Sequence, residues 1–272
     1  YEMIASPELM IAAAAERTHK IRLGTGVITL PYHNPLMVAN RIIQLDHMTM
    51  GRAMFGFGPG LLPTDASMLD IEPSTQRERM MESLRVIIRL LDGETVTEKT
   101  DWYSLKDARA HLLPYSQPRP ELAVASAVTS FGGHAAGQYG LSMLCVAATD
   151  SSGYSALDTN WKIAQDVAIE HGRVMDPASL RLVGQMHIAE TREKARENVR
   201  FGLEKWFDYV SLFLPVRFPK TGDIVDRVCS TGSAVVGTPD DAIAMIERLQ
   251  AKQGNFGVFL QQAHDWADWE AT

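Results

Sequence analysis

Three hydroxyl side chains stand together where a predicted strand gives way to a predicted helix. Ser126 ends an apolar run, and Thr129 and Ser130 come just before a helix expected from about residue 132. The first N–H groups of a helix have no partner within the helix, and the helix dipole adds positive potential there. The pattern therefore indicates an anion site, with phosphate as the best ligand. Ordinary N-capping by Thr129 or Ser130 is the alternative interpretation.

A glycine-rich segment, Gly56-Phe-Gly-Pro-Gly60, follows another short apolar run. No lysine follows these glycines, so the segment is not a phosphate-binding P-loop. Glycine lets backbone N–H groups come close to a ligand, whereas Pro59 contributes neither charge nor an N–H donor. The segment predicts a turn that contacts a ligand, and a plain surface turn is the alternative.

Histidine supplies the other candidate chemistry. His33 follows Tyr32 just beyond a predicted strand, where it either carries a proton or only fixes the loop. The segment from His264 to Trp266 contains a His-Asp pair like a triad fragment. Residues adjacent in sequence do not face one another in a regular element, and no Gly-x-Ser-x-Gly elbow supplies a nucleophile. We therefore expect no hydrolase chemistry, and no His/Asp spacing predicts a metal.

Two glycines, Gly24 and Gly26, lie inside the predicted strand that runs from about residue 20 to residue 30. Glycine weakens a strand because its backbone is freer in the unfolded chain and it has no side chain to pack. Their presence indicates either an unusual backbone at a ligand site or the close approach of a neighbouring helix.

Composition narrows the class of protein. The 272 residues are 46% hydrophobic, and 26 Lys and Arg oppose 33 Asp and Glu, which gives a net charge of −7. No basic field is present to hold nucleic acid or an anionic membrane, so a neutral small molecule is the expected ligand. Cys145 and Cys229 match no zinc or redox spacing, which favours a reducing compartment without disulfides. Without a run of about 20 apolar residues or a signal-peptide pattern, we expect a soluble, cytoplasmic protein.

Apolar runs and helical patterns alternate along the chain. Strands are predicted at about residues 20–30, 53–57, 122–126, 141–146, 180–189 and 256–260, and helices at about 6–18, 34–51, 75–91, 132–139, 156–172, 191–210 and 238–253. The helix at 75–91 begins with a Thr75-x-x-Glu78 capping box. Residues 93–120, with a possible hairpin, and residues 211–237 are predicted as insertions or loops in a single domain, 1–272.

The strands are nearly continuous in apolar residues, which is typical of an α/β fold with a parallel sheet covered on both faces. A closed barrel needs eight strands, two more than the pattern predicts. A doubly wound sheet needs no further strand. The alternation alone leaves both architectures open.

Five stretches carry a family resemblance over essentially the whole chain. They are RLGTGVITLPYHNPLMVANRIIQLDHMTMGRAMFGFGPG, RERMMESLRVIIRLLDGE, PRPELAVASAVTS followed by AGQYG, GTPDDAIAMIERL and FGVFLQQAHDW. Together, in this order, they resemble the bacterial luciferase-like family of flavin-dependent monooxygenases, and most are similar to its limonene monooxygenase branch. The resemblance implies a (β/α)8 TIM barrel with the cofactor at the carboxyl ends of the strands.

The resemblance also implies that the family's first two strands and C-terminal segment are not in this sequence. The family's usual active-site histidine lies in that N-terminal part, so the catalytic residue stays unassigned and His33 is a weak candidate. The chain departs from bacterial luciferase at Pro59, where luciferase has a phosphate-gripping arginine. The implied flavin-binding residues are Gly26 and Val27, joined by a non-proline cis peptide under the ring, Gly58 and Leu61 in the adjoining loop, and Ser126, Thr129 and Ser130 at the phosphate.

What the resemblance implies about activity is a two-component monooxygenase. A separate flavin reductase would supply reduced FMN, and O2 would provide one oxygen atom for a small apolar substrate, terpenoid-like or ketone-like. A homodimer is the family's usual assembly. Two alternatives remain: an oxidoreductase of the same fold that uses a deazaflavin, and a non-catalytic luciferase-like subunit.

Overall fold

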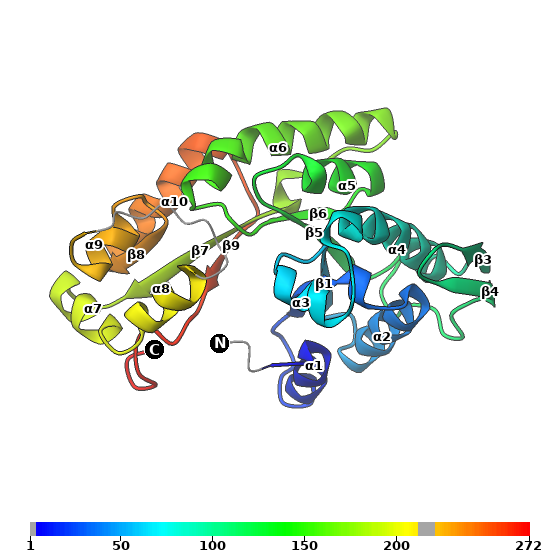
Figure 1. The fold of residues 1–272 in the computed structure, drawn as a ribbon, viewed down its shortest axis with the longest axis horizontal. Coiled ribbons are helices and arrows are strands. Elements are labelled where there is room, and N and C mark those ends of the chain that lie inside the picture. The colour runs from blue at the N-terminus through cyan, green and yellow to red at the C-terminus, as the bar shows by residue number, and fades with distance from the viewer. Residues whose placement is uncertain (1–3, 212–220) are drawn as a thin grey trace. The chain divides into compact units, whose positions relative to one another are not determined.

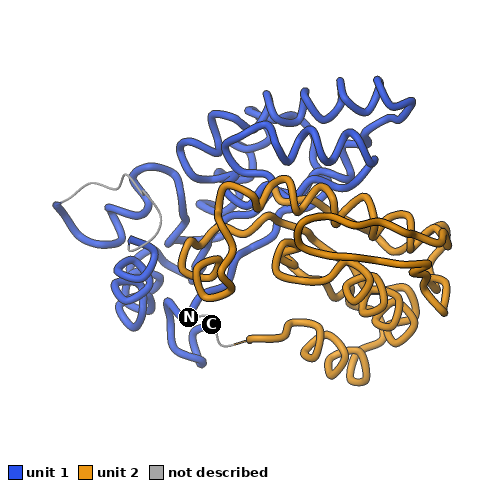
Figure 2. Tube along the Cα trace, turned by 45° about the vertical axis from the view of Figure 1, so that its right-hand side comes forward, with its two compact units in different colours: residues 1, 126–272 blue, residues 2–125 orange. Residues whose placement is uncertain are grey.

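The structure is a computed structural model that describes residues 4–211 and 221–272. The chain divides into two compact units, residues 2–125 and residues 126–272 with Tyr1, which we call the N-unit and the C-unit (Figure 2). Each unit is an alternation of helices and strands, coloured along the chain in Figure 1.

Three strands of the N-unit pair in parallel, with β2 between β1 and β5. A fourth and a fifth strand, β3 and β4, form an antiparallel hairpin that packs its apolar side chains on α4. The elements are α1 (Pro7–Ala15), β1 (Leu23–Thr29), α2 (Pro35–Met48), β2 (Ala53–Gly58), α3 (Pro63–Met68), α4 (Gln76–Leu91), β3 (Val96–Lys99), β4 (Ser104–Ala108) and β5 (Glu121–Ser126).

Strand β7 organises the C-unit, because β6, β8 and β9 all pair with it in parallel. Figure 1 shows β9 running beside β7. The elements are α5 (Phe131–Tyr139), β6 (Ser142–Cys145), α6 (Ser151–Glu170), β7 (Leu180–Ile188), α7 (Arg192–Val199), α8 (Leu203–Ser211), α9 (Ile224–Cys229), β8 (Ala234–Gly237), α10 (Pro239–Gln253) and β9 (Val258–Gln262). The predicted α/β class with parallel strands is confirmed.

Helix α5 packs unusually closely on α6 because two of its residues are glycine. A Cβ atom on Gly133 would lie 2.6 Å from the carbonyl oxygen of Asn160, and one on Gly137 would lie 2.4 Å from that of Ala164. Both distances are too short for a carbon atom, so the two helices touch through their backbones. This contact fixes the direction in which the start of α5 points.

The segment Leu45-Asp-His-Met-Thr-Met-Gly-Arg52 joins α2 to β2 through buried polar contacts. Thr49 is fully buried, and its hydroxyl donates to the Leu45 carbonyl at 2.7 Å and accepts from the Ala53 N–H at 3.0 Å. The Arg52 guanidinium donates to the carbonyls of Ala15 and Ile21, at 3.2 and 2.9 Å. This part of the family resemblance therefore has a structural role: it ties α1 and β1 to the entrance of β2.

Two of the predicted helix starts form as expected. Asn34 accepts a hydrogen bond from the Leu36 N–H at 3.0 Å, and the Asp241 carboxylate accepts from the N–H and hydroxyl of Thr238. The capping box predicted at Thr75 is wrong. The Thr75 hydroxyl donates back to the Glu72 carbonyl at 2.8 Å, because a short 3-10 turn at residues 73–75 precedes α4.

The single helix predicted at residues 191–210 is also wrong. It divides into α7 and α8, and at the break the Gly202 N–H donates to the Trp266 carbonyl at 3.0 Å. A Cβ on residue 202 would overlap the Asp265 carbonyl oxygen, so only glycine allows this approach. In the segment predicted as an interruption, residues 211–237, the structure forms α9 and β8, while residues 212–220 lie outside the described residues.

Both cysteines are free thiols, as the spacing predicted. Burial raises the pKa of the Cys145 thiol to about 12. Across residues 4–211 and 221–272, no helix has the length and apolar character that a membrane crossing requires.

We predict that Asp46→Ala lowers the free energy of unfolding by about 2 to 3 kcal/mol, because a buried hydrogen-bonded carboxylate is lost. Asp46 is fully buried, and its two oxygens accept from the Ser116 N–H at 2.8 Å and from the Ser116 hydroxyl at 2.7 Å. Urea unfolding followed by circular dichroism measures the change. The exposed Asp166→Ala, which breaks only a surface pair with Lys162, is the control and should change stability by less than about 0.5 kcal/mol. Equal effects of the two variants would contradict the assignment.

Candidate functional site

The carboxyl end of β1 has an irregular backbone beside β2. The peptide bond between Gly26 and Val27 is cis, as the resemblance implies, and the register with β2 shifts between Thr25 and Ile28. A Cβ on Gly58, at the end of β2, would lie 2.7 Å from Cγ2 of Val27. The structure therefore brings two of the predicted flavin-binding residues together: the Val27 side chain lies over the bare backbone of Gly58.

Gly24 has a simpler explanation. A Cβ there would lie 3.0 Å from the Met54 carbonyl oxygen and 3.2 Å from Cβ of Met54. Close packing thus accounts for this glycine, as one interpretation of the sequence proposed, but the neighbour is strand β2 and not a helix.

The turn after β2 is held in place by Gln76, a buried residue at the start of α4. Its side-chain amide donates to the Pro59 carbonyl and to the Tyr32 hydroxyl, both at 3.0 Å. Gly60 has a φ of 95°, and a Cβ there would lie 2.4 Å from the Gln76 nitrogen. The turn is therefore anchored to α4 and to the residues after β1, while Leu61 beyond it is 71% exposed.

His33 lies half-buried beside α1 and α2. Burial lowers the pKa of its imidazole, the Arg41 guanidinium lowers it further, and the Glu8 carboxylate opposes them. A histidine with a lowered pKa is neutral at pH 7 and is able to accept a proton. Its catalytic role stays a prediction.

Arg77 and Glu78, on the neighbouring α4, are both exposed.

The loop between β5 and α5 contains the three hydroxyls of the predicted anion site. Ser126 is 3% exposed, and its hydroxyl has no hydrogen-bond partner among the described residues. Ser130 occupies the N-cap position of α5, yet no side chain caps that helix. The alternative interpretation, in which Thr129 or Ser130 caps α5, therefore does not hold for Ser130. The exposed Thr129 and the half-buried Ser130 lie just before the first turn of α5.

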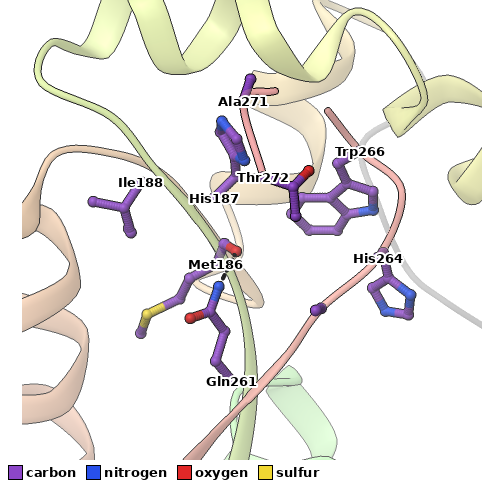
Figure 3. A pocket seen from close by; sticks show the side chains of 9 residues that line it. Met186, His187, Ile188, Gln261, His264, Trp266, Ala271 and Thr272 are labelled. Carbon is purple, nitrogen blue, oxygen red and sulfur yellow. Dashed lines mark hydrogen bonds between the residues drawn. The ribbon is translucent and has the colours of Figure 1, made fainter. Parts of the chain in front are cut away.

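A cavity of about 220 Å³ lies at the carboxyl ends of β7 and β9 in the C-unit (Figure 3). Apolar side chains of Met186, Ile188 and Trp266 line it together with His187, Gln261 and His264. His264 and Trp266, which the sequence offered as part of a triad-like fragment, have stacked rings with centroids 5.8 Å apart. Nowhere in the described ranges do three His, Cys, Asp or Glu side chains gather in a way that would hold a metal ion.

His187 was not among the residues singled out from the sequence. It is 8% exposed, and burial lowers the pKa of its imidazole. The signal that was available is its position as the penultimate residue of an apolar strand, where parallel α/β folds place ligand-contacting side chains.

Comparison with known proteins agrees with this geometry. The profile of the luciferase-like monooxygenase family matches residues 1–254. Limonene 1,2-monooxygenase of Rhodococcus erythropolis is 47% identical over 100% of this chain and 70% of its own length. The 4-hydroxyprotoasukamycin monooxygenase of Streptomyces nodosus subsp. asukaensis is 43% identical over 98% of this chain and 74% of its own.

A solved structure shares the fold. The oxygenating constituent of 3,6-diketocamphane monooxygenase from Pseudomonas putida, a type II Baeyer-Villiger monooxygenase in complex with FMN, has a TM-score of 0.78 and 22% identity, covering 100% of this chain and 81% of that one. The family profile and the two curated relatives each extend over nearly the whole sequence. The chain is therefore an enzyme of the luciferase-like, flavin-dependent monooxygenase family.

Proposed function

We propose that this protein is the oxygenating component of a two-component system: it takes reduced FMN from a separate reductase and inserts one oxygen atom from O2 into a small apolar substrate. The observation that carries the FMN assignment is the buried Ser126 hydroxyl, which has no hydrogen-bond partner among the described residues and precedes a helix whose N-cap Ser130 makes no side-chain capping bond. The family membership and the relatives' activities support the reaction type.

The residues of the α5 loop fit the phosphate of FMN. A phosphate accepts several hydrogen bonds, and the loop offers hydroxyl donors at Ser126, Thr129 and Ser130 beside the positive N-terminal end of α5. The cost of leaving the Ser126 hydroxyl without a partner is removed when an anion accepts from it. In this proposal Pro59 does not weaken the binding of FMN, because the phosphate is held by the α5 loop and needs no arginine at position 59.

The residues at the ends of β1 and β2 fit a flat ring. Val27 presents a branched apolar side chain that packs over Gly58, Gln76 holds the turn at Gly60, and Leu61 is exposed next to them. Bound reduced flavin supplies the activation of O2 that side chains do not provide. The protein's own task is to hold the ring and the substrate and to exclude water.

Reductase and oxygenase would work together in the cytoplasm, the reducing compartment in which free thiols such as Cys145 and Cys229 persist. The substrate class, terpenoid-like or ketone-like, agrees with what the named relatives act on. A homodimer through the barrel helices remains part of the proposal.

The activity is tested with purified protein, chemically reduced FMN and limonene under 18O2. We expect a product heavier than limonene by one labelled oxygen atom, detected by mass spectrometry. If the protein shows no turnover with reduced FMN but is active with a reduced deazaflavin, the result favours the deazaflavin alternative. A protein that does not bind reduced FMN at all would be the non-catalytic subunit.

We predict that Ser126→Ala and Ser130→Ala each weaken the binding of reduced FMN by about threefold to tenfold, the effect of losing one hydrogen bond to a charged group. Anaerobic fluorescence titration measures the affinity, and thermal unfolding of the free protein should change little. Ser155→Ala is the matched control, because that exposed hydroxyl on α6 donates only to the Ser151 carbonyl. Unchanged affinity in both test variants would count against the phosphate assignment.

A second prediction concerns the ring. Gly58→Ala adds a Cβ at 2.7 Å from the Val27 side chain and should displace it, so we expect at least about a tenfold loss of FMN affinity beyond the cost of overpacking. Gly24→Ala is the control, because a Cβ on Gly24 would contact Met54, which lies near the amino end of β2, the strand that ends at Gly58. It should lower stability without a selective effect on FMN. If the two variants lose affinity equally, Val27 and Gly58 are not at the ring.

A further inference from the structure

His187 lines the cavity at the carboxyl ends of β7 and β9, and a neighbouring residue determines which of its ring nitrogens carries the proton. Nε2 of His187 lies 3.2 Å from the side-chain amide nitrogen of Asn198, on α7. An amide nitrogen only donates, so Nε2 must accept, and in the neutral ring the proton then sits on Nδ1. The contact with Asn198 therefore leaves Nδ1 of His187 as the hydrogen-bond donor of the ring.

Two other polar side chains of the wall already have hydrogen-bond partners. The Gln261 amide donates to the Met186 carbonyl at 2.9 Å, the dashed bond in Figure 3, and the Thr272 hydroxyl donates to the Asp268 carbonyl at 2.8 Å. The Thr272 hydroxyl is left as an acceptor only, whereas the Gln261 amide keeps one further N–H and its oxygen. No lining residue is an aspartate, glutamate, lysine or arginine. The cavity therefore suits an uncharged ligand.

Two lining residues, His264 and Trp266, pack against the ring of Trp206. The Trp206 ring lies 5.0 Å from the Trp266 ring and 5.4 Å from the His264 ring, centroid to centroid. Nε2 of His264 and Nε1 of Trp266 are buried without a hydrogen-bond partner in the part of the chain that the structure describes. Unpartnered buried polar atoms are rare in native proteins, and these two belong to residues that line the cavity.

Size limits the ligand. A cavity of about 150 Å³ is enough for benzene, so the 220 Å³ here admits a somewhat larger ring. We propose that this cavity selects a compact, neutral, ring-containing substrate that carries an oxygen acceptor, and that His187 donates its Nδ1–H to that oxygen. The proposal rests on the proposed function in that it specifies the substrate preference of the same enzyme: a ketone, quinone or alcohol binds more tightly than a bare hydrocarbon.

The test compares two probes that share one carbon skeleton. Limonene is a hydrocarbon, and carvone is the corresponding ketone, with one added carbonyl oxygen. Binding is measured by calorimetry and by quenching of tryptophan fluorescence, with neither flavin nor reductase present. We expect the protein to bind carvone at least about fivefold more tightly than limonene, the ratio that one net hydrogen bond supports.

Variants locate the source of this preference. H187F keeps an aromatic ring but removes the donor, so carvone and limonene should bind alike, with limonene affinity nearly unchanged. H187N places an amide nitrogen near the position of Nδ1 and should restore part of the preference. H171F is the control, because His171 is exposed at the end of α6. A preference that survives in H187F overturns the proposal, as does a protein that binds neither probe.

A measurement without substitution covers the case in which H187F does not fold. Nitrogen-15 NMR of the histidine side chains reports which ring nitrogen carries the proton. We expect His187 to be protonated on Nδ1, with that resonance shifting when carvone is added. A ring protonated on Nε2 would refute the assignment. Because no step uses flavin or O2, failure of FMN binding would remove the proposed function and leave this result standing.

Discussion

Parallel pairing of the strands is the constraint on which both candidate regions depend. Strands that run in one direction bring their carboxyl ends to the same edge, and the loops that follow them emerge there. In the N-unit, β1 and β2 end side by side, so Val27 reaches Gly58 although 31 positions separate them in the chain. In the C-unit, β7 and β9 end together and place His187 near Gln261 and His264.

The residues that make this arrangement stable differ from those that face a ligand. Asp46, Thr49 and Arg52 make several hydrogen bonds to nearby backbone and side-chain groups. The candidate flavin residues are instead glycines, small hydroxyls and exposed apolar side chains. This division suits an enzyme whose chemistry belongs to a bound cofactor, because the protein must then supply shape, hydrogen bonds and dryness more than reactive groups.

Three histidines of the candidate regions share one property: burial favours their neutral form. Burial lowers the pKa of His33, His187 and His264 alike. A neutral imidazole donates from one nitrogen and accepts at the other, so its partner decides what it offers to a ligand. At His187 that partner is Asn198, on the helix that follows the same strand, and the pair therefore forms within one strand-helix unit. A site with such donors binds polar but uncharged atoms, which is what an oxygen-bearing apolar substrate presents.

The sequence by itself determined the class of fold, most of the strands and helices, and the family, and the family resemblance implied the cis peptide at Gly26 and Val27. These depend on local patterns: apolar runs of strand length, helical spacing, and motifs short enough to be recognised in order. It did not show the turn of α3, the division of α7 from α8, or α9 and β8, because these short elements are stabilised by contacts with distant residues, as Gly202 is by Trp266. Only the tertiary structure decided that Ser126 is buried without a partner, that Gln76 holds the glycine-rich turn, and that Asn198 orients His187. Each is a property of atoms brought together by folding, and spacing along the chain does not encode it.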